Sequence, residues 1–586
     1  MKHFLLITTV MMAVCSNMKA QTLAKDYKGT GNNNPISANI FCADPTALEY
    51  NGRLYVYGTN DSQEFVANGK KGNNTYNSIK SIVVFSTDDM VNWTFHGTID
   101  TKKICSGWGD VWYQGYIIGY GVSWAPSVTW RTNPETNEDE FFLYFCNSSH
   151  GVGVLKANSP IGPWKSPLKQ LLVHKGTPGA LQQSANFDPG VVIDDNGTGW
   201  LTFGGLDYDK GGTALMPGNA RIIKLKPSMT EIDGSAVSIP APYHFEANEL
   251  NVIGGKYVYT YCSHWDRNQS EWNTYKSEHN ISADMPGIGT MCYMVSDNPA
   301  DPNSWVFKGY YGPGVAGNNH SHLQKFQGKY YHIYHNHGSV LLDAMKADGA
   351  VDASAGDYRS ICVNQATVDE STATVNRVTL NNEGVKQIKN LNPYEWQEAE
   401  TMASCGGVEY EDFTNIKPNT KISQLGNDAS RNMQVNMKPD SWISVRKVDF
   451  GTGANKFTLR AKGKATLELR FSRAGRPTST IEFSSTSTEL EEQTFEIDDT
   501  KFLNVKNNLF IAVKDATDFY VDAWKFSNDD PTGIQEVNSV VDGNSSVFYD
   551  LSGHRLPDAS LYHGIVIEQY TDGNGVKHSR KILSGK

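Results

Sequence analysis

Five stretches of this chain repeat one order of residues: an opening residue, an apolar strand, a turn with Gly or Asn, and an aromatic strand. The first runs from Phe41 to Asp61 as FCADPTALEYNGRLYVYGTND, with Asp44 as its polar opener. The others open at Trp124, Asp188, Glu246 and His320. A long repeat with strand pairs in each unit is typical of a β-propeller with one blade per repeat. We therefore predict an all-β fold that begins with a five-bladed β-propeller.

A large β-sandwich whose hairpins look alike is the alternative, but the constant order within each unit favours the propeller. In a propeller the innermost strand of each blade lines the central channel. If the openers mark the starts of innermost strands, then Asp44, Asp188, Glu246 and His320 converge at one mouth of that channel. Residues far apart in the sequence become neighbours because the fold is cyclic.

Composition limits the partners. The chain is 39% hydrophobic and 11% aromatic, so it can bury a sizeable core, and its net charge is -11. This charge disfavours nucleic acid, because phosphate binding needs clustered Lys and Arg. No stretch reaches the roughly 18 apolar residues of a membrane span. A neutral ligand remains compatible with the composition.

The first twenty residues predict an export signal. A basic start precedes an apolar run from Phe4 to Val14, and Ala20 is a small residue suited to cleavage. Cys15 raises the alternative of a lipoprotein, but the residue before it fits a lipid-attachment site poorly. We expect residues 1–20 to be removed and the protein to be periplasmic, cell-surface or secreted.

The repeat ends near Asn392, which divides the chain. We predict a propeller domain over residues 36–392. Short alternating strands then predict a β-sandwich (jelly-roll) over residues 394–527. After a break at NDDP, residues 532–586 form a Gly- and Asp-rich tail with a basic end, for which we expect a sorting or docking role.

Three carboxylates at one channel mouth predict acid/base chemistry. Splitting a glycosidic bond needs a proton for the leaving oxygen and a base for water, or a nucleophile, and Asp/Glu pairs supply both. The alternative is structural, because Asp before Pro commonly starts a turn. Glu249 competes with Glu246, but in a regular strand it lies on the opposite face.

The motifs FCADPTALEYNGRLYVYGTND, SWAP at Ser123, FDPGVVIDDNGTGW and HFEANEL resemble glycoside hydrolase family 43, and within it the arabinoxylan arabinofuranohydrolases. The resemblance covers roughly residues 36–390. It implies a five-bladed propeller that removes α-L-arabinofuranosyl side chains from arabinoxylan with inversion. A β-xylosidase or endo-arabinanase on the same fold, or a non-catalytic carbohydrate-binding propeller, are the alternatives.

The resemblance also implies roles for the three acids. Asp44 matches the general base that activates water, and Glu246 matches the general acid that protonates the leaving group. Asp188 matches the acid that tunes Glu246 and orients the substrate. An inverting pair is expected to have its carboxyl groups about 6.5–9.5 Å apart, which leaves room for the water.

Four further residues are candidates at the same mouth. Trp124 is expected to form an apolar floor for a sugar, or else to be ordinary core. Asn319 and Arg359 are expected to bind substrate, and the guanidinium of Arg359 also suits Asp44. His320 matches the channel histidine of the family, which often lies beside a calcium or sodium ion. No cofactor is expected for catalysis.

The second domain resembles a family 6 carbohydrate-binding module through QEAE at residue 397 and VDAWKF at residue 521. That resemblance implies a structural calcium ion held by Glu398, Glu400 and Asp522, whose hard oxygens suit this metal. Tyr410 matches one aromatic of the sugar site of the family. Residues 484–495 carry no Trp to stack against it, so a purely structural role for this domain is the alternative.

Overall fold

The computed structural model describes residues 22–108, 112–113, 116–117, 119–314, 317–410, 421–424, 433–528, 547–550, 555–556, 564–571 and 577–584. The predicted export signal, including Cys15, lies outside these residues, and so does most of the predicted tail. Among the described residues, no helix is long and apolar enough to cross a membrane.

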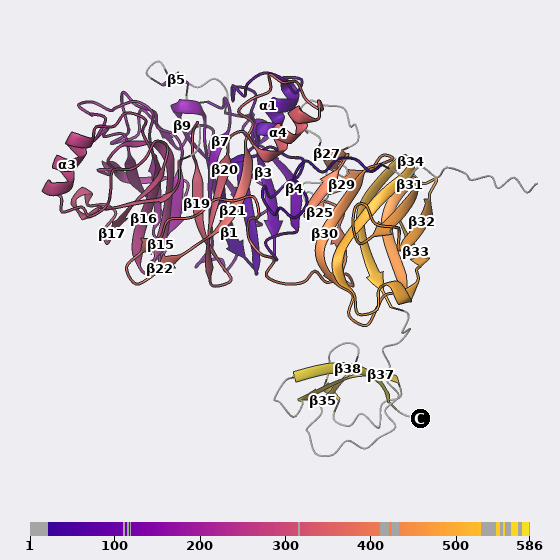
Figure 1. Ribbon diagram of the computed structural model, residues 1–586. Coiled ribbons are helices and arrows are strands. Elements are labelled where there is room, and N and C mark those ends of the chain that lie inside the picture. The colour runs from indigo at the N-terminus through magenta and orange to yellow at the C-terminus, as the bar shows by residue number, and fades with distance from the viewer. Residues whose placement is uncertain are drawn as a thin grey trace, which may run out of the picture.

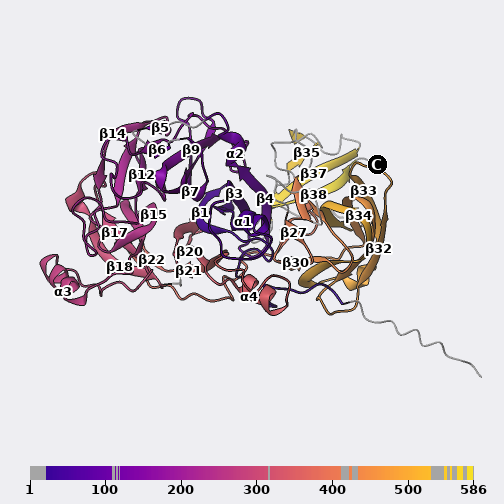
Figure 2. The same ribbon diagram turned by 90° about the horizontal axis from the view of Figure 1, so that it is seen from above.

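Five antiparallel sheets stand around a common axis in the first two thirds of the chain (Figures 1 and 2). The first contains β1 (Ala43–Tyr50), β2 (Arg53–Thr59), β3 (Ser81–Thr87) and β4 (Trp93–Asp100). The second contains β7 (Trp124–Thr132), β8 (Asp139–Cys146), β9 (Gly151–Ala157) and β10 (Val173–His174). The third contains β11 (Gly190–Ile193), β12 (Gly199–Phe203), β13 (Arg221–Leu225) and β14 (Ile232–Ser238). The fourth contains β15 (His244–Ile253), β16 (Lys256–Ser263), β17 (Met291–Ser296) and β18 (Val306–Gly312), and the fifth β19 (Ser321–Phe326), β20 (Lys329–Asn336) and β21 (Ser360–Ala366).

The first strand of each sheet is the innermost. β1 contacts β7, β7 contacts β11, β11 contacts β15, β15 contacts β19, and β19 contacts β1 again. This closed ring of strands confirms the predicted five-bladed β-propeller. It also places each predicted opener at or beside the start of an innermost strand.

The N-terminal segment closes the ring, because it runs along the last strand of the fifth blade. The Ile36 N–H donates to the Ile361 carbonyl (2.9 Å), and the Cys42 N–H donates to the Arg359 carbonyl (2.9 Å). The first and last parts of the propeller therefore share one seam, and Asp44 lies directly after it.

Helices and short hairpins cover the blade ends. The helices are α1 (Asp61–Ala67), α2 (Thr101–Ile104), α3 (Gln269–Glu278) and α4 (Val340–Ala347), with 3-10 turns at Ser148–His150 and Pro302–Ser304. A further 3-10 turn, Asp499–Lys501, lies in the second domain, between β33 (Glu491–Glu496) and β34 (Lys506–Ser527). The hairpins pair β5 (Trp112–Tyr113) with β6 (Tyr116–Ile117), and β22 (Val368–Asp369) with β23 (Thr374–Val375).

A β-sandwich follows the propeller, as predicted. Its strands are β24 (Gln397–Glu398), β26 (Ser404–Gly406), β27 (Glu409–Tyr410), β28 (Lys421–Gln424), β29 (Met433–Asn436), β30 (Trp442–Asp449), β31 (Lys456–Arg470), β32 (Ser479–Ser484), β33 (Glu491–Glu496) and β34 (Lys506–Ser527). In the tail, β35 (Val547–Tyr549), β36 (Arg555–Leu556), β37 (Gly564–Thr571) and β38 (Lys577–Ser584) form a sheet of their own.

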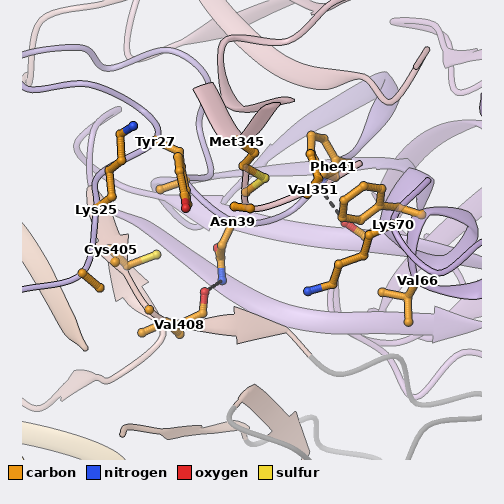
Figure 3. A pocket seen from close by; sticks show the side chains of 17 residues that line it. Lys25, Tyr27, Asn39, Phe41, Val66, Lys70, Met345, Val351, Cys405 and Val408 are labelled. Atoms are coloured by element: carbon orange, nitrogen blue, oxygen red, sulfur yellow. Dashed lines mark hydrogen bonds between the residues drawn. The ribbon is translucent and has the colours of Figure 1, made fainter. Parts of the chain in front are cut away.

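The propeller and the sandwich also meet along a seam of their own, the domain interface. β25 (Thr401–Met402) pairs with β4 and so adds a fifth strand to the first blade. One hydrophobic cluster is continuous from Phe85 in the propeller to Trp524 in the sandwich. A cavity of about 240 Å³ lies in this seam, where Asn39 donates to the Val408 carbonyl (3.3 Å; Figure 3).

Candidate active site

The innermost strands are kinked where they enter the channel. Asp44, Ala125, Asp188 and Ala247 have positive φ angles of 47°, 31°, 49° and 64°. The pairings of β1, β7 and β15 with their neighbours shift register at these points. Non-glycine residues avoid this region of backbone space, and β-bulges re-aim side chains beside active sites. The Asp-Pro and Ala-Pro steps are therefore more than ordinary turn starters.

Asp44 is buried among cationic and imidazole groups. Its Oδ1 accepts a hydrogen bond from Nη1 of Arg359 (2.8 Å), and its backbone N–H donates to Nδ1 of His335 (3.0 Å). Burial alone would raise the pKa of Asp44, but Arg359, with His335 and His320, holds it well below the usual range. Asp44 is thus ionised and suited to accept a proton from water.

Asp188 faces Asp44 across His320. Nδ1 of His320 lies 3.8 Å from Asp44 Oδ1 and 3.9 Å from Asp188 Oδ2. The Ala247 N–H donates to the same Asp188 oxygen (2.9 Å). Burial and the charge of Asp44 raise the pKa of Asp188 to about 7, while burial lowers the pKa of His320 to about 4. A neutral imidazole therefore separates the two aspartates.

Glu246 is the third buried carboxyl group at this mouth. Burial, followed by the charges of Asp188 and Asp44, raises its pKa well above the usual range. A carboxyl group that stays protonated near neutral pH is suited to donate a proton. Asp44, Asp188 and Glu246 are called the channel carboxylates below.

The expected opposite orientation of Glu249 was wrong. The bulge at Ala247 interrupts the strand alternation, so Glu246 and Glu249 pair with Cys262 and Thr260, which lie on one face of β16. Glu249 therefore also reaches groups of other innermost strands. Oε2 of Glu249 accepts from Ser127 Oγ (3.3 Å) and lies 3.3 Å from His322 Nδ1. Glu249 therefore has its own polar partners, away from Arg359 and Asp44.

The other predicted residues lie around the same mouth. Half-buried Trp124 donates from Nε1 to the Tyr76 carbonyl (2.8 Å), and the Tyr76 ring lies 5.0 Å from the Arg359 guanidinium. Asn319 is buried, and its Nδ2 donates to the carbonyls of Gly289 (2.8 Å) and Pro313 (3.2 Å). Substrate binding by Trp124, Asn319 and Arg359 stays a prediction.

Sequence reasoning missed three residues here. Asp61 pairs with Arg359, with Oδ1 2.8 Å from Nη2. His335 contacts Asp44 from the end of β20. Trp265 is 37% exposed, and its ring lies 4.4 Å from that of Phe245, the residue before Glu246. The available signal for Trp265 was its position: it is an aromatic residue just after β16, the strand that pairs with the strand of Glu246.

Glu398, Glu400 and Asp522 are called the sandwich carboxylates. Burial raises the pKa of Glu398, with Asp522 adding to the effect, and burial and Glu398 raise the pKa of Glu400 further. Buried oxygens of Glu398 and Glu400 lack a hydrogen-bond partner. Mutually repelling, hard oxygen donors fit a calcium ion. Within the described residues, however, no group of three or more His, Cys, Asp or Glu side chains has the geometry of a metal site. The side chain of Tyr410 lies outside the described part of the chain.

All seven cysteines in the described residues are free and buried. Cys146 is one of them, and its Sγ lies 3.5 Å from Asp188 Oδ1. A disulfide framework therefore does not hold this fold together, which agrees with the scattered positions of these residues in the sequence.

Comparison with known proteins places this arrangement. The family model of glycosyl hydrolases family 43 matches residues 32–339. An arabinoxylan arabinofuranohydrolase of Paenibacillus polymyxa is 35% identical over 438 residues, which are 73% of this chain and 62% of that protein. An arabinoxylan arabinofuranohydrolase of Bacillus subtilis (strain 168) is 34% identical over 483 residues, which are 80% of this chain and 86% of that protein.

A solved structure agrees with these relatives. The crystal structure of a family 43 arabinoxylan arabinofuranohydrolase from Bacillus subtilis in complex with cellotetraose matches with a TM-score of 0.69 and 31% identity, covering 87% of this chain and 99% of that chain. The likeness therefore includes the sandwich as well as the propeller. With its five blades, its channel carboxylates and a family match over more than half of its length, the chain belongs to glycosyl hydrolases family 43.

Proposed function

We propose that this protein is an exported, inverting glycoside hydrolase that removes α-L-arabinofuranosyl side chains from arabinoxylan. The proposal is carried by the division of labour among the channel carboxylates, in which Asp44 is held ionised and Glu246 is held protonated. Two relatives at 35% and 34% identity that bear the name arabinoxylan arabinofuranohydrolase support the substrate.

The reaction needs two proton transfers. Asp44 takes a proton from water as the water oxygen bonds to the anomeric carbon of the arabinose. Glu246 gives its proton to the glycosidic oxygen as the bond to the xylan backbone breaks. Attack on the face opposite the leaving group inverts the anomeric centre. Asp188, beside both, raises the pKa of Glu246 and so keeps the proton on the acid.

Product analysis on arabinoxylan tests this function. We expect free arabinose with little xylose, and proton NMR of the first-formed sugar is expected to show the inverted anomer. Release of xylose alone would replace the substrate assignment with that of a β-xylosidase, and cleavage of arabinan alone would favour an endo-arabinanase. No released sugar from any of these substrates would favour a carbohydrate-binding propeller.

Two further parts of the proposal concern the ends of the molecule. We infer export from residues 1–20, and N-terminal sequencing of the secreted protein is expected to start near Gln21. In the sandwich, Glu398, Glu400 and Asp522 would hold a calcium ion that neutralises their mutual repulsion. Calorimetric titration of the metal-stripped protein with Ca²⁺ tests this site, and absence of binding would exclude it.

A further inference from the structure

Asp61 forms hydrogen bonds with Arg359, the arginine that contacts the proposed base Asp44. Its fully buried carboxylate opens α1. Oδ2 accepts hydrogen bonds from the backbone N–H of Arg359 (3.0 Å) and from its Nε (2.9 Å), and Oδ1 accepts from Nη2 (2.8 Å). Nη1 of the same guanidinium donates to Asp44 Oδ1 (2.8 Å). The guanidinium of Arg359 therefore binds Asp61 through the edge formed by Nε and Nη2 (its two-nitrogen edge), and it binds Asp44 through Nη1.

The surroundings fix Asp61 relative to Asp44. Asn60 caps α1, because its Oδ1 accepts from the Gln63 N–H (3.2 Å). Ser62 Oγ accepts from the Phe41 N–H (2.7 Å), which ties α1 to the segment that leads into Asp44. The helix and the base therefore belong to one hydrogen-bonded unit.

The charges of these groups explain why the pairing of Asp61 with Arg359 affects Asp44. Arg359 is 2% exposed, and a buried guanidinium needs carboxylate partners. Its fork geometry favours two parallel hydrogen bonds to one carboxylate. Without Asp61, the nearest remaining carboxylate is Asp44, and the two-nitrogen edge would turn toward it. Both oxygens of Asp44 would then accept a hydrogen bond from the cation, which lowers the basicity of the oxygen that must take a proton from water.

We propose that Asp61 is a positioning residue, which holds Arg359 so that a single nitrogen meets Asp44 and one base oxygen stays available for water. This role rests on the proposed function of Asp44 as the base. Asp61 itself touches neither the water nor the sugar in this scheme.

The first test is Asp61→Asn, which keeps the shape and removes the charge. We expect kcat to fall about 10- to 100-fold, the scale of a misplaced catalytic group, with KM changed less than about threefold. Asp89→Asn is the matched control. Asp89 is also a buried acid of the first blade, and it accepts from the Val91 and Asn92 N–H groups, away from Arg359. We expect this control to lower thermal stability while kcat stays near wild type.

A double-mutant cycle with Arg359→Met separates positioning from general stability. If Asp61 acts through Arg359, adding Asp61→Asn to Arg359→Met changes kcat by less than about twofold. The double variant removes both buried charges together, so the comparison with Arg359→Met remains available even if Asp61→Asn alone fails to fold. A further large loss in the double variant would overturn the proposal, as would equal kcat for Asp61→Asn and Asp89→Asn. If Asp44→Asn keeps the wild-type rate, the proposed base is wrong instead.

Discussion

The channel carboxylates and the sandwich carboxylates are each a set of three acids beside an arginine, but their electrostatics differ. In the propeller, Arg359 is 2% exposed and contacts Asp44 among the three acids. In the sandwich, the side chain of Arg460 is 32% exposed and is shared between Asp522 and the surface residue Glu492. The buried Arg359, which also pairs with Asp61, holds the pKa of Asp44 low while the pKa values of Asp188 and Glu246 are raised. The more exposed Arg460 pairs with Asp522 and leaves Glu398 and Glu400 repelling each other. The first arrangement suits proton transfer, and the second suits a bound cation.

The largest expected effect is the loss of activity when one of the proposed catalytic acids of the propeller is replaced. Asp44→Asn or Glu246→Gln is expected to lower kcat by about 10²–10⁴-fold, the usual contribution of a general base or acid. Glu398→Gln in the sandwich is the control and is expected to leave kcat unchanged. The kcat of all three variants is measured from the release of arabinose from arabinoxylan, and circular dichroism checks their folding. A wild-type rate for either propeller variant would contradict its assigned role.

A smaller effect concerns Asp188. Its charge helps to raise the pKa of Glu246, which must be protonated to act as the acid. In Asp188→Asn this charge is absent, so the pKa of Glu246 falls and the proton is lost at lower pH. We therefore expect the alkaline limb of the kcat/KM profile to move to lower pH. An unmoved limb would show that Asp188 acts only by orienting the substrate.

Metal removal sharpens the contrast in stability. If calcium binds the sandwich carboxylates, a chelator is expected to lower the Tm of that domain by about 5–10 °C, the scale for a ligand at about 100 times its Kd. Glu400→Gln is expected to abolish this dependence, because Glu400 is buried in the cluster. Glu492→Gln, which removes a surface acid that also pairs with Arg460, should keep it. Equal chelator sensitivity in the two variants would place the ion elsewhere.

The smallest effect concerns Arg460. Arg460→Met removes the cation that partly neutralises Asp522, so the remaining acids should depend more strongly on Ca²⁺. We expect a slightly larger gain in Tm on adding Ca²⁺ and no change in kcat. Arg359→Met, in contrast, is expected to impair catalysis severely. Similar effects of the two substitutions on kcat would remove the distinction drawn between the clusters.

The repeat predicted the five blades, and with them the meeting of Asp44, Asp188 and His320, because cyclic topology converts equivalent positions into neighbours. The prediction failed at Glu249, because it assumed that side chains alternate regularly along the strand, and the β-bulge at Ala247 interrupts that alternation. It also failed at Asp61. An acid in TNDSQEF is ordinary at a helix start, and its partner Arg359 lies 298 residues away. Contacts across such separations depend on how the ring closes.

Ring closure gives the site a place in folding. The hydrogen bond between Asp44 and Arg359 spans 315 residues, and the strand seam beside it joins the start of the propeller to its last strand. Such long-range contacts form late and slowly, because loop closure costs entropy before any contact rewards it. A chain that stops before Arg359 would lack both this arginine and β21, and with them the seam. Recovery of activity after refolding therefore reports closure of the whole propeller, whereas recovery of strand content can precede it.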